Sequence, residues 1–444
     1  MNPVGAAPPA GSAEDEPHAQ QDVVVTGLGI VAGDYLDPDV LFDHLAAGGS
    51  LVAPDPRMAG WGLPGGVSAR VPEEARRHLE GLVPAGTGPL GPAGTLGWYA
   101  ADSAWADSGL GATVAPERVG VFVGCNRTMS TAADFAELTD HCDPTSGTFD
   151  LDTYLDDVGP RADHDVLLRP TTLTTALARQ FDAGVAETHA AACAAGATAI
   201  GSACRDIRSG RLDVALAGGT ESLTTFAAVV GFLALGALAL GTTGDPTAVS
   251  RPFDKDRTGF VIGDAAAFLV LESRAHARRR GARTRARIAG FAGVSEAVRI
   301  TASSLDGQSY ADCMRLALDD AGLEPTDIGH VNAHGTATAT NDRCEAAALA
   351  LLFGERVGSV PVTANKSAVG HTLAGSGAVE AVLSVLTLQR QTLLPTLNHR
   401  AGDEVTSVLD VVTEARTWPV SAVLSNSFGF GGQNSSLVFT AESE

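Results

Sequence analysis

Basic residues are in short supply in this chain. Its 444 residues include 30 lysines and arginines against 52 aspartates and glutamates, which gives a formal net charge of −22. Nucleic acids are bound through their phosphates by basic surfaces, so this balance argues against a nucleic-acid partner. One run of arginines (Arg278–Arg280, with Arg283 and Arg285) could meet an acidic protein, but such a run is more typical of a solvated helix end.

The chain also lacks paired cysteines. Its six cysteines include no C-x-x-C pair, which argues against a disulfide framework and against a structural zinc site. We therefore expect a reduced, cytoplasmic protein without a bound metal. The N-terminus has no basic stretch followed by an apolar run, so no signal peptide is expected, and the composition of residues 1–20 predicts a disordered tail.

Long apolar runs are absent, with one near exception. Residues 222–244 carry no charge, and residues 226–240 are almost wholly apolar or glycine. Threonines bound this run on both sides, and it falls short of the roughly 18 apolar residues that a membrane helix needs. We therefore predict no membrane association, and a buried core or pocket segment at this place.

Aromatic residues make up only 5% of the chain, whereas glycine contributes 51 residues. This composition favours helices packed closely on sheets over a core of bulky rings. Strand-like runs alternate with helix-like ones, which predicts an α/β fold. The expected strands are residues 23–26, 118–123, 214–217, 268–271 and 328–332, and the expected helices are residues 94–108, 194–209, 309–321, 345–353 and 379–391.

Three units of the sequence occur twice, in the same order. Residues 104–126 parallel residues 317–337, with a helix that ends in Asp-x-Gly-Leu, a connector and a strand. Residues 186–200 parallel residues 361–382, and two later strands each close on a pair of glycines. We infer two similar halves, residues 21–275 and 276–444, that face each other across one composite site.

Cys193 stands where an extended run meets a helix. The free N–H groups and the positive dipole end of a helix N-terminus stabilise a thiolate. The surrounding alanines and Gly196 leave room for a substrate. Most isolated cysteines are small buried hydrophobes, so the local context leaves both interpretations open. Cys204, in the interior of the same helix, is expected to be a packing residue.

Two histidines stand at the ends of elements in the second half. His334 follows the strand 328–332, and α/β folds place reacting groups in such loops. His371 is expected at the start of the helix that runs to residue 391, where the dipole keeps the imidazole neutral. By the internal repeat, His371 takes the position that corresponds to Cys193.

Lys366 lies in an otherwise small and apolar stretch, residues 361–374. A lysine in such a stretch is expected to be buried and to need a carboxylate partner. Asp342 and Glu345, which follow His334 in the sequence, are the natural candidates.

The last candidate functional segment is a glycine-rich motif, residues 425–434. Gly429, Gly431 and Gly432 permit positive φ and a close approach of the backbone to a ligand. Backbone N–H groups on such a loop could form half of an oxyanion hole. A tight turn between two strands is the plainer interpretation, and both can hold together.

Together these residues resemble the β-ketoacyl synthases of fatty acid and polyketide assembly. The resemblance spans nearly all of the chain after the tail, and the order and spacing of the motifs make it specific. It implies the α/β thiolase-like fold, with two duplicated αβαβα halves. The motifs are DVVVTGLG (22–29), AACAAG (191–196), AGGTE (217–221), RPFDKDRTGFVIG (251–263), NAHGTAT (332–338), NKSAVGHTLAG (365–375) and SNSFGFGGQN (425–434).

The resemblance implies three catalytic roles. Cys193 would accept the acyl chain from an acyl carrier protein. His334 and His371 would promote decarboxylation of a malonyl extender and stabilise the enolate. The implied reaction is acyl transfer, decarboxylation and Claisen condensation, without a cofactor.

The resemblance also implies supporting residues. Lys366 would be the supporting lysine, with Asp342 and Glu345 as its acidic partners. Phe430 would be the gating aromatic residue beside Gly429, and its N–H would join that of Cys193 in the oxyanion hole.

The implied partners are an acyl carrier protein, loaded with acyl and malonyl groups, and a second subunit. That subunit would be a copy of this chain or a paralogous ketosynthase or chain-length factor. The alternative is that this chain is itself a chain-length-factor-like partner that does not elongate. Such partners lack the active cysteine, whereas Cys193 is present here.

Some positions depart from the family pattern. Ala337 stands where a glycine is common, Asp264 and Ala266 replace Glu and Gly, and Gln433 replaces Thr. Residues 125–190 match the pattern poorly. These departures favour a specialised type II polyketide subunit over housekeeping fatty acid synthesis, and they leave the acyl group open.

Two rival enzymes fit less well. Gly27-x-Gly29 after a strand resembles a dinucleotide loop, but the helix that must begin at those glycines is missing, because residues 34–38 continue as a loop. A thiolase would carry a second catalytic cysteine near the C-terminal glycine loop, and residues 425–434 contain none.

Overall fold

The computed structural model describes residues 22–63, 66–111, 114–126, 139–158, 169–239, 241, 245–296 and 303–442. The predicted disordered tail lies outside these residues. The strands are β1 (Val23–Ala32), β2 (Ala53–Pro54), β3 (Val67–Ser68), β4 (Val119–Gly124), β5 (Val185–His189), β6 (Val214–Ser222), β7 (Asp264–Ser273), β8 (Ala286–Ser295), β9 (His330–Asn332), β10 (Pro361–Thr363), β11 (Thr392–Leu393), β12 (Asp410–Val411), β13 (Arg416–Thr417), β14 (Ala422–Gly429) and β15 (Gln433–Thr440). The helices are α1 (Pro38–Ala46), α2 (Pro56–Gly60), α3 (Glu73–Leu82), α4 (Gly91–Ser108), α6 (Leu151–Val158), α8 (Thr171–Gln180), α9 (Ala195–Arg208), α10 (Phe226–Ala234), α11 (Arg274–Arg279), α12 (Gln308–Ala321), α13 (Ala339–Phe353), α14 (Lys366–Val369) and α15 (Ser376–Arg390).

The main sheet is mixed, and the same strand order occurs in it twice. The first half contributes β1-β7-β6-β4-β5, and the second contributes β8-β15-β14-β9-β10, with β12 beside β10. The halves meet where β1 pairs with β8 in antiparallel fashion. The predicted duplicated α/β fold is therefore confirmed. The boundary predicted at residue 275 lies within α11, between the two halves, and stays a prediction.

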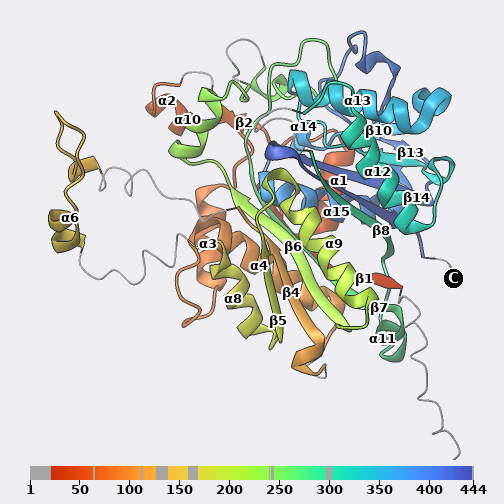
Figure 1. Cartoon of the computed structure of the whole chain (residues 1–444), viewed down its shortest axis with the longest axis horizontal. Coiled ribbons are helices and arrows are strands. Elements are labelled where there is room, and N and C mark those ends of the chain that lie inside the picture. The colour runs from red at the N-terminus through yellow and green to blue at the C-terminus, as the bar shows by residue number, and fades with distance from the viewer. Residues whose placement is uncertain are drawn as a thin grey trace, which may run out of the picture.

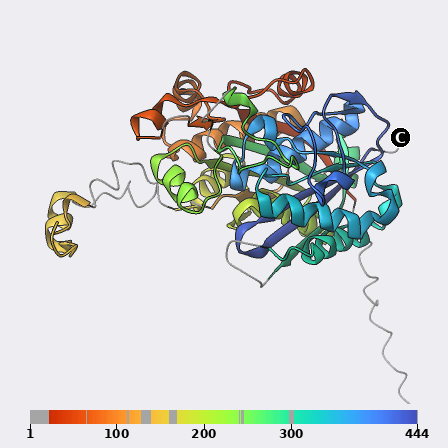
Figure 2. The same ribbon diagram turned by 90° about the horizontal axis from the view of Figure 1, so that it is seen from above.

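Helices lie between the two halves of the sheet and on their outer faces. Buried residues of α9 and α15 form one core with residues from strands of both halves. A second core packs α4 and α8 on the first half, and a third packs α12 and α13 on the second half. In Figures 1 and 2 the second half, in cyan and blue, gathers on one side of the molecule. The central helices α9 and α15 bring their N-terminal turns, which follow Cys193 and His371, together.

The glycines of the rival dinucleotide loop lie inside β1. A Cβ atom at Gly27 would stand 2.1 Å from the carbonyl oxygen of Ala104, and one at Gly29 would stand 2.0 Å from that of Ala100. Both carbonyls belong to α4. The glycines thus allow α4 to pack closely on the strand, and they form no phosphate-binding turn.

Of the uncharged stretch of residues 222–244, the structure describes 222–239 and 241, and these are only partly buried. Within it, α10 buries Ala228 and Val229 but leaves Phe226 38% and Val230 42% exposed, and Leu235 just after it is 55% exposed. The prediction of a buried segment therefore holds for one face of the helix and is wrong for the other. Among the described residues, no helix is both long and apolar enough to cross a membrane.

The arginine run divides into two groups. Arg280 forms an ion pair with the buried Glu272, and Arg285 forms one with Asp107. Arg278, Arg279 and Arg283 are exposed at and after the end of α11. Arg280 and Arg285 thus tie this segment to the body of the first half, and the preference for a solvated helix end over a docking site stays a prediction for the three exposed arginines.

Candidate active site

The turn that carries Cys193 is held under strain. Cys193 lies in a short 3-10 turn (Ala192–Ala194) between β5 and α9, and Ala192 before it has a φ of +47°. A non-glycine residue in this region is disfavoured. The side-chain amide of Asn126, two residues after β4, donates to the carbonyl oxygen of Ala192 over 3.1 Å and to Glu221 over 3.1 Å. Sequence analysis missed Asn126, which ties the turn to two strands of the first half.

The Cys193 thiol is buried and faces an imidazole. Its Sγ lies 3.2 Å from Nε2 of His371. Burial raises the pKa of the thiol to about 11, although Lys366 and the backbone N–H of Phe430 act to lower it. Burial therefore outweighs the stabilisation of a thiolate that the sequence analysis expected from the helix N-terminus. The pair at rest is a thiol beside a neutral imidazole.

His371 stands before α15 and not at its start. Its backbone pairs with the segment that precedes β7: its N–H donates to Val261, and Gly263 donates to its carbonyl. The turn and helix that match those of Cys193 begin at Leu373 and Ser376, so the repeat position of Cys193 is Ala374. The predicted correspondence was therefore wrong by three residues, although both side chains reach the same point in space. His371 Nδ1 lies 2.9 Å from the Ser376 hydroxyl, and burial lowers the pKa of the ring well below its usual value.

His334 follows β9, and hydrogen bonds to Glu345 and Lys366 hold it in place. Its backbone N–H donates to Glu345 over 2.8 Å. The Lys366 ammonium donates to its Nδ1 over 3.2 Å and to its carbonyl oxygen over 2.8 Å. Burial, and then the Lys366 charge, lower the pKa of His334 well below its usual value. Because a lysine ammonium can only donate, Nδ1 accepts and the proton of the neutral ring is on Nε2.

The carboxylate partner of Lys366 is Glu380, a buried residue of α15. The predicted pairing with Asp342 or Glu345 was wrong. Glu345 instead accepts the N–H groups of His334 and Gly335, each over 2.8 Å, while Asp342 accepts the N–H of Phe253 over 2.7 Å. Asp342 also accepts a backbone hydrogen bond from Thr336, so both acids shape the loop that carries His334. Burial raises the pKa of Glu345 and of Glu380 to about 7.

The glycine-rich loop approaches Cys193 through its backbone. A Cβ atom at Gly429 would stand 3.2 Å from the N atom of Cys193, and the N–H of Phe430 points to the Cys193 sulfur. Gly431 and Gly432 have positive φ, whereas Gly429 does not. At Gly432 a Cβ atom would stand 2.1 Å from the carbonyl oxygen of Glu296. Glycine is therefore required here for close packing as well as for the turn.

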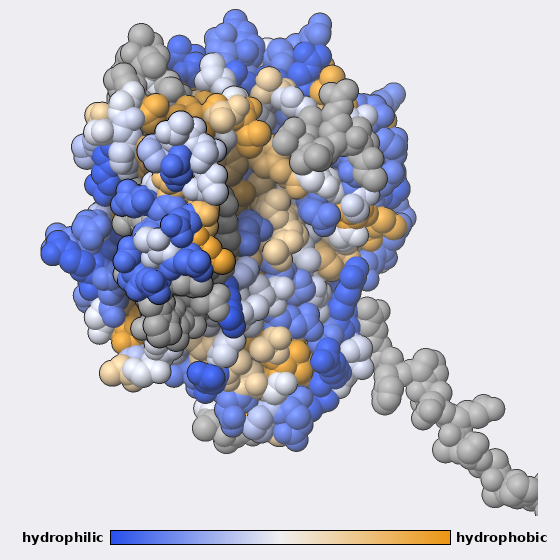
Figure 3. All heavy atoms as spheres, turned by 60° about the vertical axis from the view of Figure 1, so that its left-hand side comes forward, coloured by the Kyte–Doolittle hydropathy of each residue, from blue (hydrophilic) through white to orange (hydrophobic). Residues whose placement is uncertain are grey.

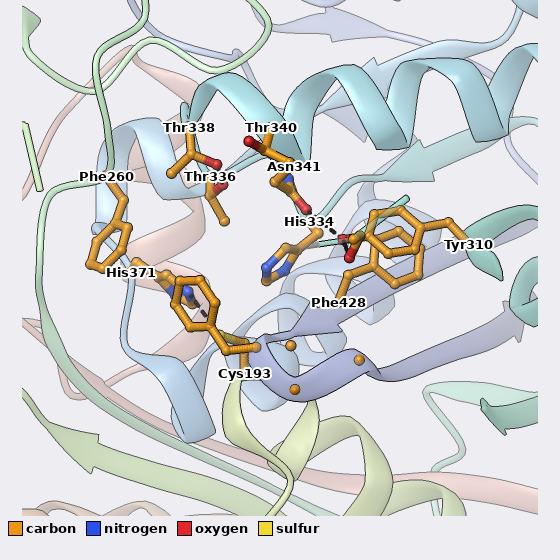
Figure 4. A pocket seen from close by; sticks show the side chains of 15 residues that line it. Cys193, Phe260, Tyr310, His334, Thr336, Thr338, Thr340, Asn341, His371 and Phe428 are labelled. Carbon is orange, nitrogen blue, oxygen red and sulfur yellow. Dashed lines mark hydrogen bonds between the residues drawn. The ribbon is translucent and has the colours of Figure 1, made fainter. Parts of the chain in front are cut away.

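These residues converge on a cavity with about 60 Å³ of free space (Figure 4). Figure 4 shows Cys193 with His371 and Phe260 on one side and His334 on the other. Above His334 the lining is polar, and beyond it the Tyr310 ring stacks on Phe428 while the Tyr310 hydroxyl lies 3.3 Å from Asn341 Oδ1. Sequence analysis missed Phe260, Tyr310 and Ser376. The polar side is lined by Ser303, Tyr310, Thr336, Thr338, Thr340 and Asn341.

A metal ion suits this site poorly. Within the described part of the chain, Cys193, His334 and His371 form the group whose ligand atoms, all within 4.8 Å of one another, lie close enough to hold one. The hydrogen bond from Lys366 puts the proton of His334 on the nitrogen that faces the cavity. That nitrogen has no free lone pair, so it can donate a hydrogen bond but cannot bind a metal.

Ala337, one of the departures from the motif pattern noted in the sequence, adopts a φ of +63° in a buried turn. We predict that Ala337→Gly raises the free energy of unfolding by about 0.5–1 kcal/mol, because glycine takes this conformation without steric cost. Ala346→Gly, inside α13, is the matched control and should lower it by about 1 kcal/mol. Urea unfolding measures both. A loss of stability in the Ala337 variant would show that the positive φ of Ala337 does not strain the backbone.

The fold and the site define a thiolase-like enzyme whose buried cysteine and two imidazoles suit acyl transfer. Residues 20–277 match the family model "Beta-ketoacyl synthase, N-terminal domain", and residues 285–400 match "Beta-ketoacyl synthase, C-terminal domain". The chain therefore belongs to the β-ketoacyl synthase family, a family of acyltransferases.

Individual relatives agree with this assignment. The chain is 34% identical over 431 residues to "Oxytetracycline polyketide putative beta-ketoacyl synthase 1" of Streptomyces rimosus, with 95% of this chain and 98% of that protein covered. It is 43% identical over 247 residues to "3-oxoacyl-[acyl-carrier-protein] synthase 2" of Rhizobium meliloti (strain 1021), covering 56% of this chain and 58% of that protein. Among solved structures, "The ishigamide ketosynthase/chain length factor" matches with a TM-score of 0.81 at 33% identity, covering 96% of this chain and 100% of that chain.

Proposed function

We propose that this chain condenses an acyl group carried on Cys193 with a malonyl unit carried on an acyl carrier protein. The observation that carries the proposal is the buried convergence of the Cys193 sulfur with nitrogens of His371 and His334 within 4.8 Å. A non-elongating partner subunit has no use for this arrangement.

The first step is transfer of the acyl group to Cys193. The sulfur attacks the thioester carbonyl while the thiol proton passes to Nε2 of His371, 3.2 Å away. A thiol with a pKa of about 11 needs such a base at neutral pH. The N–H groups of Cys193 and Phe430 stabilise the oxyanion. When the intermediate collapses, the carrier thiolate leaves and takes the proton from His371.

The second step is decarboxylation of the malonyl thioester. Loss of CO₂ leaves two electrons on the thioester as an enolate, and the Nε2–H of His334 donates to its oxygen. The Lys366 bond to Nδ1 keeps the proton on Nε2 throughout. The enolate carbon then attacks the acyl carbonyl on Cys193 and the new carbon–carbon bond forms. The Cys193 sulfur leaves as a thiolate and takes up one proton from solvent, because the proton of the first step left with the carrier thiol.

The partners follow from this chemistry. The acyl and malonyl groups would arrive on an acyl carrier protein, as the name of the Rhizobium meliloti relative indicates for that protein. A second subunit, either a copy of this chain or a paralogous chain-length factor, would complete the enzyme. The likeness to a polyketide synthase over 95% of the chain supports a role in type II polyketide or specialised fatty acid biosynthesis.

The test is intact-mass analysis after incubation with acyl carrier protein thioesters. We predict an acyl adduct on the wild type and none on Cys193→Ala. Cys204→Ala is the matched control, because Cys204 is equally buried, has a pKa also raised to about 11, and contacts no imidazole in the described structure. That variant should be acylated as the wild type is. An adduct that survives Cys193→Ala would refute the proposed nucleophile.

A further inference from the structure

The cavity has two unlike walls. The wall on the side of His334 carries the hydroxyl and amide groups of six side chains beside the ring of Phe428, whereas the surroundings of Cys193 are apolar. Phe260 and Phe430 both line the cavity, and the ring of Phe232 packs against both, with centroids 5.3 Å and 6.5 Å away. The apolar wall is therefore an aromatic surface that begins at the nucleophile.

The segments that build the apolar wall have almost no hydrogen-bonding side chains. Residues 226–239, which include α10, contain none, and residues 58–63 contain only the indole of Trp61. Both segments contribute to the apolar cluster around Cys193.

The polar groups next to this wall are already engaged. The hydroxyls of Ser222 and Thr224 donate to Asp264, and that of Thr225 accepts the N–H of Ala228 at the start of α10. On the other side of Cys193, the amide of Asn126 is bonded to Ala192 and Glu221. Of these side-chain donors, only the O–H of Thr225 has no acceptor among the described residues, so a hydrogen bond to the acyl chain is available only at the N-terminal end of α10.

The apolar wall continues to the surface. Trp61 follows α2 and packs edge-on against Phe226 of α10, with centroids 5.6 Å apart. Phe226 is itself partly exposed, and so are Val230 and Leu235 in and just after the same helix. Helices α2 and α10 lie on the left of Figure 1, the side that comes forward in Figure 3, where hydrophobic residues gather around a hollow.

We propose that the acyl group on Cys193 is a hydrocarbon chain, saturated or unsaturated, that extends along α10, and that chains bearing β-keto groups are rejected. This inference rests on the proposed function and names its substrate class. A keto oxygen buried against the wall beyond Thr225 would lose its hydrogen bonds to water and find no side-chain donor in residues 226–239. A hydrocarbon chain gains free energy from the same burial. The polar wall would then face the malonyl extender and the part of the acyl carrier protein that carries it.

The experiment compares three thioesters of equal length on the acyl carrier protein: octanoyl, 2-octenoyl and 3-oxooctanoyl. The rate of Cys193 acylation is followed by intact mass. The first two should react within a few-fold of each other, and the 3-oxo chain at least about tenfold more slowly. Equal rates for all three would overturn the inference while leaving the nucleophile intact. No adduct from any of them would overturn the proposed function as well.

A matched pair of variants tests whether the wall along α10 causes the difference in acylation rate between octanoyl and 3-oxooctanoyl. Phe232→Tyr places one hydroxyl on the apolar wall, so it should narrow the difference between octanoyl and 3-oxooctanoyl. Phe181→Tyr makes the same change where the ring packs on Trp105, away from the cavity lining, and should leave the wild-type ratio. If both variants keep the wild-type ratio, the wall along α10 does not select the chain.

Discussion

Replacing Lys366 with methionine should lower the free energy of unfolding by about 3–5 kcal/mol, because it leaves the carboxyl group of Glu380 buried without its partner. Glu380 is 1% exposed, and among the described residues one of its oxygens has no hydrogen-bond partner even when Lys366 is present. Burial already raises its pKa to about 7 against the pull of Lys366. Without that pull the pKa rises further.

The sign of the pH dependence follows from this shift. A carboxyl group whose pKa is raised in the folded state favours folding at low pH, and that contribution is lost as the pH rises above its usual value of 4.5. Lys366→Met should therefore destabilise the protein less at about pH 5 than at about pH 8. Urea unfolding at both values measures the difference.

The matched control is the double variant Lys366→Met with Glu380→Gln. It removes both charges, so it should recover most of the lost stability. It should not recover condensation, because Lys366 also holds the tautomer of His334. Equal stabilities for the single and double variants would show that Glu380 is not the group that Lys366 neutralises.

Much of the fold was predictable because its signals are local. The helix predicted at 94–108 is α4 (Gly91–Ser108), and that predicted at 379–391 is α15 (Ser376–Arg390). The repeated units predicted the duplication, which the strand order confirms. The residue-by-residue correspondence between the two halves was harder to predict. A small-residue stretch gives no anchor for alignment, so His371 was matched to Cys193 although Ala374 holds that position.

The site was predictable where a residue reacts and less so where it supports. Cys193, His334, His371 and Lys366 stand in recognisable motifs, and the structure brings their side chains together. Glu380 was missed, although it is the only charged residue between Ser376 and Gln389 and a lone charge in a buried helix is a signal. Asn126 and Tyr310 have no such signal, because their roles depend on which loops the fold brings together.

Loss of the His334 imidazole should separate the two half-reactions. In His334→Ala the enolate oxygen loses its neutral donor, and decarboxylation should fall by about 10²–10³-fold. Acylation of Cys193 should stay within a few-fold of wild type, because His371 and the N–H groups of Cys193 and Phe430 are untouched. Release of labelled CO₂ from malonyl carrier protein measures the first, and intact mass measures the second.

The control for this variant is His330→Asn. His330 is also buried, with a pKa lowered to about 3, but it bonds to Thr363 and does not line the cavity. It should change stability and leave both half-reactions near their wild-type rates. If His334→Ala slows acylation as much as decarboxylation, the two imidazoles act as one unit. The separate roles proposed for His371 in acylation and for His334 in decarboxylation would then be wrong.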